Sequence, residues 1–201
     1  MSTPTRALHC PGGLRVLRAE VAAWLDETHP RPVRVLIFCA GDGRDLIDVL
    51  RRRSDADRVE GLLVELDLRN ATRARAAVAE AGLRAVAVRV ADAGDPASYS
   101  DAVPADLVIL AGIFGNISDR DIHRVVRSLP MMCARDARVI WTRHRGEPDL
   151  TGVIRGWLRE VGMAERSFTA PEDLLFSVGV HDFMHAPTGW DPPTRLLTFI
   201  R

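Results

Sequence analysis

Two carboxylates and two glycines follow a strongly apolar run near the start of the chain. Gly41 and Gly43 flank Asp42, and Asp45 follows two residues later, directly after the apolar run 33–38. Glycine lets the backbone turn sharply and approach a ligand closely. The two carboxylates would repel a phosphate, because two unit charges ~4 Å apart interact by about 4 kcal/mol at an effective dielectric near 20. The residue types therefore favour a ligand with a positive charge.

The same residues argue against two phosphate-binding turns. A P-loop needs a lysine after its second glycine, and the chain contains no lysine. A dinucleotide-binding turn needs a third glycine, but Leu46 occupies that position. S-adenosylmethionine has no phosphate, and it carries an ammonium, a carboxylate and a sulfonium cation. We therefore expect this cationic nucleoside, rather than NAD, at the turn.

Strands and helices alternate around this turn at the spacing of βα units. The run 33–38 is nearly continuous in apolar residues, as expected for a buried parallel strand, and the apolar spacing becomes helical from Leu46. Further strands are predicted at 61–64, 85–90, 106–110 and 137–143, with a short irregular or helical turn at 95–101. Helices are predicted at 14–28, 70–81, 118–130 and 148–162, and β-rich segments at 165–170, 174–183 and 195–200.

Over roughly residues 31–182 these features resemble the class I S-adenosylmethionine-dependent methyltransferases. The stretch 40–45, Ala-Gly-Asp-Gly-Arg-Asp, looks like their glycine-rich first motif. Stretches 139–145 and 174–181 are similar to a poorly characterised bacterial branch called "putative methyltransferases". The resemblance implies an α/β fold: a doubly wound Rossmann-like methyltransferase sheet, mostly parallel with a terminal antiparallel strand, plus an N-terminal helix.

The resemblance also implies where the cofactor S-adenosyl-L-methionine, and its product S-adenosyl-L-homocysteine, would bind. Glu65 ends the second strand, where the family has an acid on the ribose hydroxyls. Asp92 and Ala93 follow the third strand, where the family contacts the adenine. The expected cofactor-binding residues are Ala40, Gly41, Asp42, Gly43, Asp45, Glu65, Leu66, Asp92, Ala93, Ala111 and Gly112.

Residues that act on a methyl acceptor are expected after the fourth and fifth strands, because α/β sheets bind ligands beyond the carboxyl ends of their strands. His144 is a candidate general base and Asn116 a second catalytic candidate. Phe114, Arg143 and Arg145 are candidates for contacting the acceptor. Each has an alternative role: Phe114 in the core, Asn116 in a turn, His144 as a loop histidine, and the arginines as solvated strand ends.

The chain is predicted to form a single domain over residues 1–201. Segment 1–30 would hold an N-terminal helix that folds over the open edge of the site as a lid. Residues 31–182 would form the cofactor-binding core, and 183–201 a C-terminal loop and strand. The alternative to an active methyltransferase is a catalytically silent or regulatory module that keeps the fold and the cofactor site.

The composition limits which partners and which cellular compartment we expect for this protein. The 27 basic and 27 acidic residues balance, so no global field attracts nucleic acid. Three cysteines without metal-like spacing fit a reducing cytoplasm, and no apolar run approaches ~18 residues. His181, Asp182 and His185 fall in a strand and a loop, where the spacing does not form a metal site. We expect a cytoplasmic enzyme for a small-molecule acceptor, without metal, membrane or nucleic acid; its oligomeric state stays open.

Overall fold

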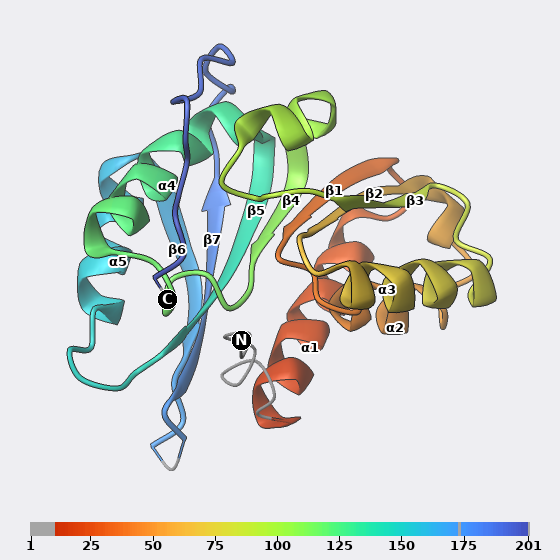
Figure 1. Cartoon of the computed structure of the whole chain (residues 1–201), viewed down its shortest axis with the longest axis horizontal. Helices are drawn as coiled ribbons and strands as arrows, with labels where there is room; N and C mark the ends of the chain where they lie inside the picture. Colours follow the sequence, from red (N-terminus) through yellow and green to blue (C-terminus); the bar gives the residue numbers. More distant parts are fainter. Residues whose placement is uncertain (1–10, 173, 201) are drawn as a thin grey trace.

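The computed structural model describes residues 11–172 and 174–200, which fold around one seven-stranded sheet (Figure 1). The strands lie in the order β3-β2-β1-β4-β5-β7-β6. Neighbours from β3 to β5 pair in parallel, and β7 runs antiparallel to both β5 and β6. The strands are β1 Val33–Phe38, β2 Val59–Glu65, β3 Val86–Val90, β4 Ala105–Leu110, β5 Cys133–His144, β6 Met163–Thr169 and β7 Phe176–Phe183. The predicted mostly parallel sheet is confirmed. Its antiparallel strand, β7, lies between β5 and the edge strand β6.

Helices cover both faces of the sheet. They are α1 Pro11–Thr28, α2 Arg44–Leu50, α3 Leu68–Glu80, α4 Asp119–Met132 and α5 Thr151–Glu160, with short 3-10 helices at Ala56–Arg58 and Pro96–Ala102. Buried residues of α1 and α2 form one core cluster, and those of α4 and α5 form the other. Figure 1 shows α4 and α5 grouped away from α1, α2 and α3. The arrangement is the doubly wound α/β architecture.

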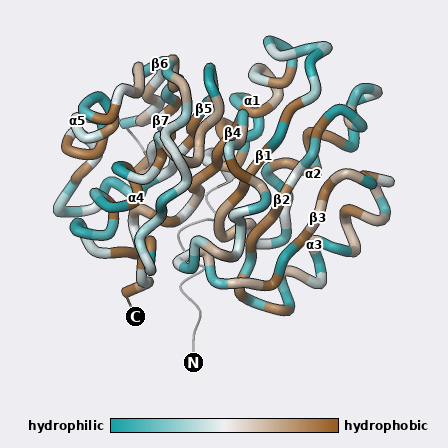
Figure 2. The backbone as a smooth tube through the Cα atoms, turned by 90° about the horizontal axis from the view of Figure 1, so that it is seen from above, coloured by the Kyte–Doolittle hydropathy of each residue, from teal (hydrophilic) through white to brown (hydrophobic). Residues whose placement is uncertain are grey.

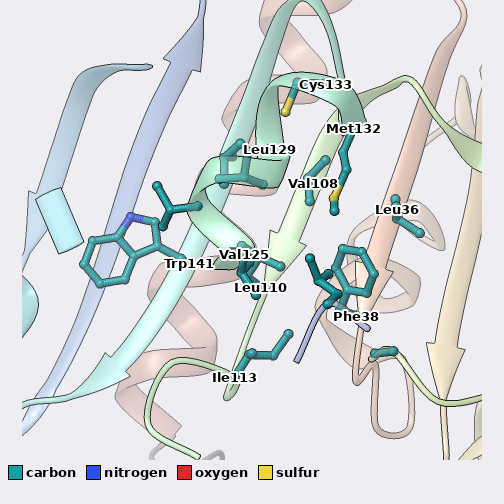
Figure 3. Close-up of a cluster of buried hydrophobic side chains, with 14 of the residues drawn as sticks. Leu36, Phe38, Val108, Leu110, Ile113, Val125, Leu129, Met132, Cys133 and Trp141 are labelled. Atoms are coloured by element: carbon teal, nitrogen blue, oxygen red, sulfur yellow. The ribbon is translucent and has the colours of Figure 1, made fainter. Parts of the chain in front are cut away.

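Strand β1 is buried on both faces and fixes the position of the glycine turn that follows it. Val35 and Ile37 join the cluster with α1 and α2, whereas Leu36 and Phe38 face the cluster with α4. Figure 3 shows Leu36 and Phe38 in that second cluster, and the strands at the centre of Figure 2 are correspondingly rich in hydrophobic residues. Because successive side chains of a strand point to opposite faces, an unbroken apolar run is what a central parallel strand requires.

Helix α1, the segment expected to act as a lid, is part of the packed fold and contributes no wall residue to the pocket described below. Leu17, Val21 and Trp24 are at most 2% exposed and pack with β1 and α2. At the helix end, the Glu27 carboxylate accepts a hydrogen bond of 3.0 Å from the guanidinium of Arg138 on β5. Burying such side chains stabilises the fold by about 1.5–3 kcal/mol each. Opening α1 would expose them, so the helix is a fixed layer of the sheet.

Several segment boundaries differ from the predictions; strand β5, for example, begins at Cys133 and not at residue 137. Residues 195–200 form no strand of the sheet: Phe199 makes an isolated bridge to Ile117, because this segment hydrogen-bonds to loops instead of to a sheet edge. Helix α5 begins at Thr151 and not at the predicted Pro148. The Thr151 N–H donates to the Asp149 side chain at 2.9 Å. Helix α4 continues past Pro130 to Met132.

Among the described residues, none of the helices combines the length and the apolar character that crossing a bilayer requires.

Candidate functional site

The turn after β1 adopts a backbone conformation that favours glycine. Gly41 and Gly43 have φ values of 58° and 77°, in the left-handed region that L side chains rarely adopt. A Cβ at Gly43 would lie 2.6 Å from Ile47 and 2.7 Å from Leu63, whereas one at Gly41 would meet nothing within 4 Å. Gly43 therefore allows α2 to pack against the sheet, and Gly41 borders open space.

The Glu65 carboxylate holds this turn against the end of β2. Its Oε2 accepts the Gly41 N–H at 2.8 Å, and its Oε1 accepts the Asp67 N–H at 2.8 Å. The side chain is buried, so these charge-assisted bonds are little screened by solvent. A carboxylate offers about four lone-pair sites, which leaves acceptor capacity for a ligand beside the turn.

A pocket of about 300 Å³ opens beside the glycine turn. It is formed where β1, β2, β3 and β4 end, together with the C-terminal segment. This is the edge at which open α/β sheets bind ligands. Its walls are Cys39, Gly41, Val64, Glu65, Leu66, Asp67, Asn70, Ala91, Asp92, Ala93, Gly112, Asn116 and Phe199.

The pocket walls carry carboxylates without basic side chains among the described residues. The three acids are Glu65, Asp67 and Asp92. From outside the pocket, Arg69 pairs with Asp67 at 2.9 Å and Arg195 pairs with Asp92 at 2.6 Å. Two of the three carboxylates are thus paired with arginines, and hydroxyl and amino donors of a ligand would find acceptor oxygens on all three. The wall therefore suits the hydroxyl and amino groups of a nucleoside.

Cys39 is a wall residue of low reactivity. Burial, with added repulsion from Glu65 and Asp92, raises the pKa of its thiol to about 12. Because the thiolate is the nucleophile of cysteine chemistry, the thiol is inert at neutral pH. Its backbone also has a positive φ of 53°, so Cys39 helps shape the turn.

The structure brings together about half of the predicted cofactor-binding residues. Gly41, Glu65, Leu66, Asp92, Ala93 and Gly112 line the pocket, and Ala40, Asp42, Gly43, Asp45 and Ala111 do not. Asp42 instead pairs with Arg44 at 2.7 Å. Ala40 and Gly43 support the turn through its backbone, since the Ala40 N–H donates to Val64 and the Gly43 N–H to Ala40.

The predicted set does not contain six further wall residues, which are Cys39, Val64, Asp67, Asn70, Ala91 and Phe199. Most are neighbours of predicted positions at the strand ends, and the strand periodicity could have identified them. Phe199 had no local signal, because its place depends on where the C-terminal segment packs.

Asp45 is a buried acid at the start of α2. It is 7% exposed, and its Oδ1 has no hydrogen-bond partner. Burial raises the pKa of this carboxyl to about 6, although Arg18 opposes the shift. A buried charge without full pairing is destabilising, so Asp45 reduces the stability of the folded chain at neutral pH.

We expect the variant Asp45→Asn to be more stable than the wild type at pH 7.5, and equally stable near pH 3.5. The unfolded chain releases the Asp45 proton around the ordinary pKa of 3.8, whereas the folded chain releases it at about 6. Between these values the folded state binds more protons, so its stability falls as pH rises, and the penalty is constant above about pH 6. The gain at pH 7.5 should be on the order of 2–3 kcal/mol. Urea unfolding at both pH values measures it, and equal stabilities at pH 7.5 would contradict the expectation.

Phe114, predicted to contact an acceptor, belongs to the core and does not line the pocket. Its side chain is fully buried, and its ring centroid lies 5.8 Å from that of Trp141 on β5. Apolar side chains of this size are held by the packing around them. Asn116, two residues on, does line the pocket, and its side-chain amide donates to the Gly112 carbonyl at 2.7 Å.

The three residues at the end of β5 lie outside the pocket walls. The Arg143 guanidinium donates to the Phe114 carbonyl, and that of Arg145 donates to the Leu174 carbonyl at 2.6 Å. These donors therefore hold loops together, while Nε of each arginine has no hydrogen-bond partner. His144 is exposed, and its Nδ1 accepts the Gly146 N–H at 3.0 Å.

Comparison with known proteins identifies both a family and the fold. A family described as "Putative methyltransferase" matches residues 13–159. No curated protein matches the chain.

Three solved structures illustrate the similarity of fold. Magnesium protoporphyrin IX methyltransferase (ChlM) from Synechocystis PCC 6803 is 13% identical with a TM-score of 0.65, over 90% of this chain and 85% of its own. A TehB-like SAM-dependent methyltransferase from Corynebacterium glutamicum is 16% identical with a TM-score of 0.57, over 89% and 98%. An O-methyltransferase family protein from Burkholderia thailandensis is 16% identical with a TM-score of 0.60, over 89% of this chain and 61% of its own length.

Proposed function

Because this chain belongs to the family described as "Putative methyltransferase", we propose that it binds S-adenosyl-L-methionine in the pocket beside the glycine turn. It would transfer the methyl group to a small-molecule acceptor and release S-adenosyl-L-homocysteine. The observation that carries this proposal is the wall of the pocket: three carboxylates, no basic side chain among the described wall residues, and a glycine turn open to the space. Such a wall suits the hydroxyl, amino and cationic groups of S-adenosylmethionine.

The roles of the wall residues follow from their positions. Glu65 would accept hydrogen bonds from the ribose hydroxyls, and Asp92 with Ala93 would contact the adenine. Leu66 is 62% exposed although it is a large apolar residue, and a bound nucleoside would cover it. Gly41 and Gly112 would let the backbone approach the methionine part, because neither carries a side chain into the pocket.

Methyl transfer needs little chemistry from the protein itself. S-adenosylmethionine carries a good leaving group on the transferred carbon, so positioning and desolvation of the two reactants supply most of the acceleration. Asn116 is the predicted catalytic residue that lines the pocket, and its amide could orient an acceptor oxygen or nitrogen. A general base is needed only for an acceptor that must lose a proton.

The direct test is calorimetry with S-adenosylmethionine, S-adenosylhomocysteine and NAD. We expect micromolar binding of the first two and no measurable binding of NAD. Incubation with methyl-labelled cofactor and a panel of metabolites should then label one class of small molecule. Binding without transfer to any compound of a cell extract would instead favour a catalytically silent cofactor-binding module, and NAD binding alone would overturn the proposal.

We expect the variant His144→Ala to keep both its cofactor affinity and its turnover close to wild-type values. The physical reason is that His144 is exposed, lies outside the pocket walls, and uses Nδ1 to hold Gly146. Calorimetry and the pH–rate profile with the identified acceptor check this result. A loss of 10²–10⁴-fold in turnover, together with a change in the acid limb of the profile, would make His144 the general base.

A further inference from the structure

The C-terminal segment 195–200 lies across the loops that follow β3 and β4. The Leu196 N–H donates to the Gly94 carbonyl at 2.8 Å, and the Ile200 N–H donates to the Asn116 carbonyl at 2.9 Å. In Figure 1 the dark-blue end of the chain runs beside α4 toward the loop between β4 and α4. We call residues 195–200 the C-terminal strap; it lies beyond the family match, which ends at residue 159.

The strap is anchored as firmly as an element of the core. Leu196 and Leu197 are at most 1% exposed. The Thr198 N–H donates to Oδ2 of Asp121 at 2.9 Å. A Cβ on Gly94 would lie 2.3 Å from the Leu197 carbonyl oxygen, so the strap and the loop after β3 approach each other as closely as a glycine permits. Packing of this kind fixes the strap in one position over the pocket edge.

Two side chains of the strap reach the pocket: Arg195 lies at Asp92 after β3, and Phe199 lies at the loop after β4, where it bridges to Ile117. Phe199 is a wall residue and is partly exposed, so part of its aromatic side chain is accessible to a ligand. Arg195 donates to Oδ2 of Asp92 at 2.6 Å, while Oδ1 of Asp92 accepts the Gly94 N–H at 2.8 Å. The Asp92 carboxylate is thus held on both oxygens. Its side chain remains 32% exposed, so lone pairs stay available on the pocket side.

We propose that the C-terminal strap completes the nucleobase subsite of the pocket and sets its preference for adenine. Phe199 supplies an aromatic wall for the base, and Arg195 is a positioning residue that orients Asp92. A carboxylate held in this way accepts a hydrogen bond from the 6-amino group of adenine, whereas it repels the 6-oxo group of hypoxanthine, which is also an acceptor. This inference rests on the proposed function and assigns specificity to a segment outside the matched family region.

The test compares S-adenosylhomocysteine with S-inosylhomocysteine, in which a 6-oxo group replaces the 6-amino group, by calorimetry. We expect Phe199→Ala to bind S-adenosylhomocysteine at least about fivefold more weakly, in line with loss of one base–aromatic contact. Its matched control is Ile200→Ala, on the same strap, because Ile200 is 58% exposed and is not a wall residue. Phe199→Leu, which keeps apolar bulk without a flat ring, should be intermediate and covers the case in which the alanine variant does not fold.

Arg195→Ala should reduce the preference for adenosyl over inosyl ligand by about tenfold, and Arg195→Lys should restore part of it. The matched control is Arg31→Ala, since Arg31 also pairs with an aspartate at 2.6 Å and is similarly exposed, but lies just before β1, at the amino ends of the strands. A structural role alone would lower thermal stability without changing the ratio of the two affinities.

The outcomes separate this inference from the proposed function. Suppose that the wild type binds S-adenosylhomocysteine and that Glu65→Ala does not. If the Phe199 and Arg195 variants then keep the wild-type affinity and selectivity, only the role of the strap is overturned. No binding of S-adenosylhomocysteine to the wild type would overturn the proposed function, and the strap inference with it.

Discussion

The variant Gly41→Val is expected to lose measurable binding of S-adenosylmethionine while it keeps the wild-type fold. Gly41 lines the pocket, and a side chain there would meet no protein atom within 4 Å. Valine would therefore extend into the space that the cofactor needs instead of colliding with the core. The φ of 58° adds backbone strain, on the order of 1–2 kcal/mol. We expect affinity to fall at least about a hundredfold, which corresponds to about 2.7 kcal/mol.

Gly82→Val is the matched control for this result. Gly82 has a φ of 66° and no atom within 4 Å of an added Cβ, but it follows α3 and is not a wall residue. Both variants should lose a similar amount of thermal stability because they carry the same backbone strain. Calorimetry should show normal cofactor affinity in Gly82→Val only. Unchanged affinity in a folded Gly41→Val protein would remove the glycine turn from the cofactor site.

The second large effect is expected from Glu65→Ala, which should weaken cofactor binding at least about tenfold. Hydrogen bonds to a charged group contribute about 1.5–3 kcal/mol each, and Glu65 is expected to accept from the ribose hydroxyls. The same carboxylate accepts the N–H groups of Gly41 and Asp67, so its loss also frees the glycine turn. Calorimetry with S-adenosylhomocysteine measures the change without turnover.

Two comparison variants show which of these roles dominates. Glu65→Gln keeps one acceptor oxygen without the charge, so its affinity should lie between those of the wild type and the alanine variant. Asp67→Ala removes the N-cap of α3, where the side chain accepts the Arg69 N–H at 2.8 Å. It should reduce stability by about 1 kcal/mol with a smaller effect on affinity. If Asp67→Ala weakens binding and Glu65→Ala does not, Asp67 and not Glu65 holds the ribose.

Local sequence patterns were sufficient to predict the central part of the fold and the end of the sheet at which the pocket opens. The apolar run 33–38 could only be stable when buried on both faces, and the two glycines after it required a tight turn. The order of strands and helices then placed Glu65 and Asp92 at the same edge of a parallel sheet, because parallel strands end together. These features depend on local periodicity and on connections within one βα unit, which a sequence expresses directly.

The roles of the remaining candidate residues depend on contacts between segments that are far apart in the chain. Phe114 could not be assigned to the core until β5 placed Trp141 beside it, and Arg145 could not be assigned a structural role until the loop at Leu174 supplied its acceptor. Arg195 meets Asp92 across 103 residues of chain, and no local pattern marks such a contact. A side chain that could serve in several roles is assigned to one of them by its burial and its hydrogen-bond partners. Both are set by packing between elements and not by spacing along the chain.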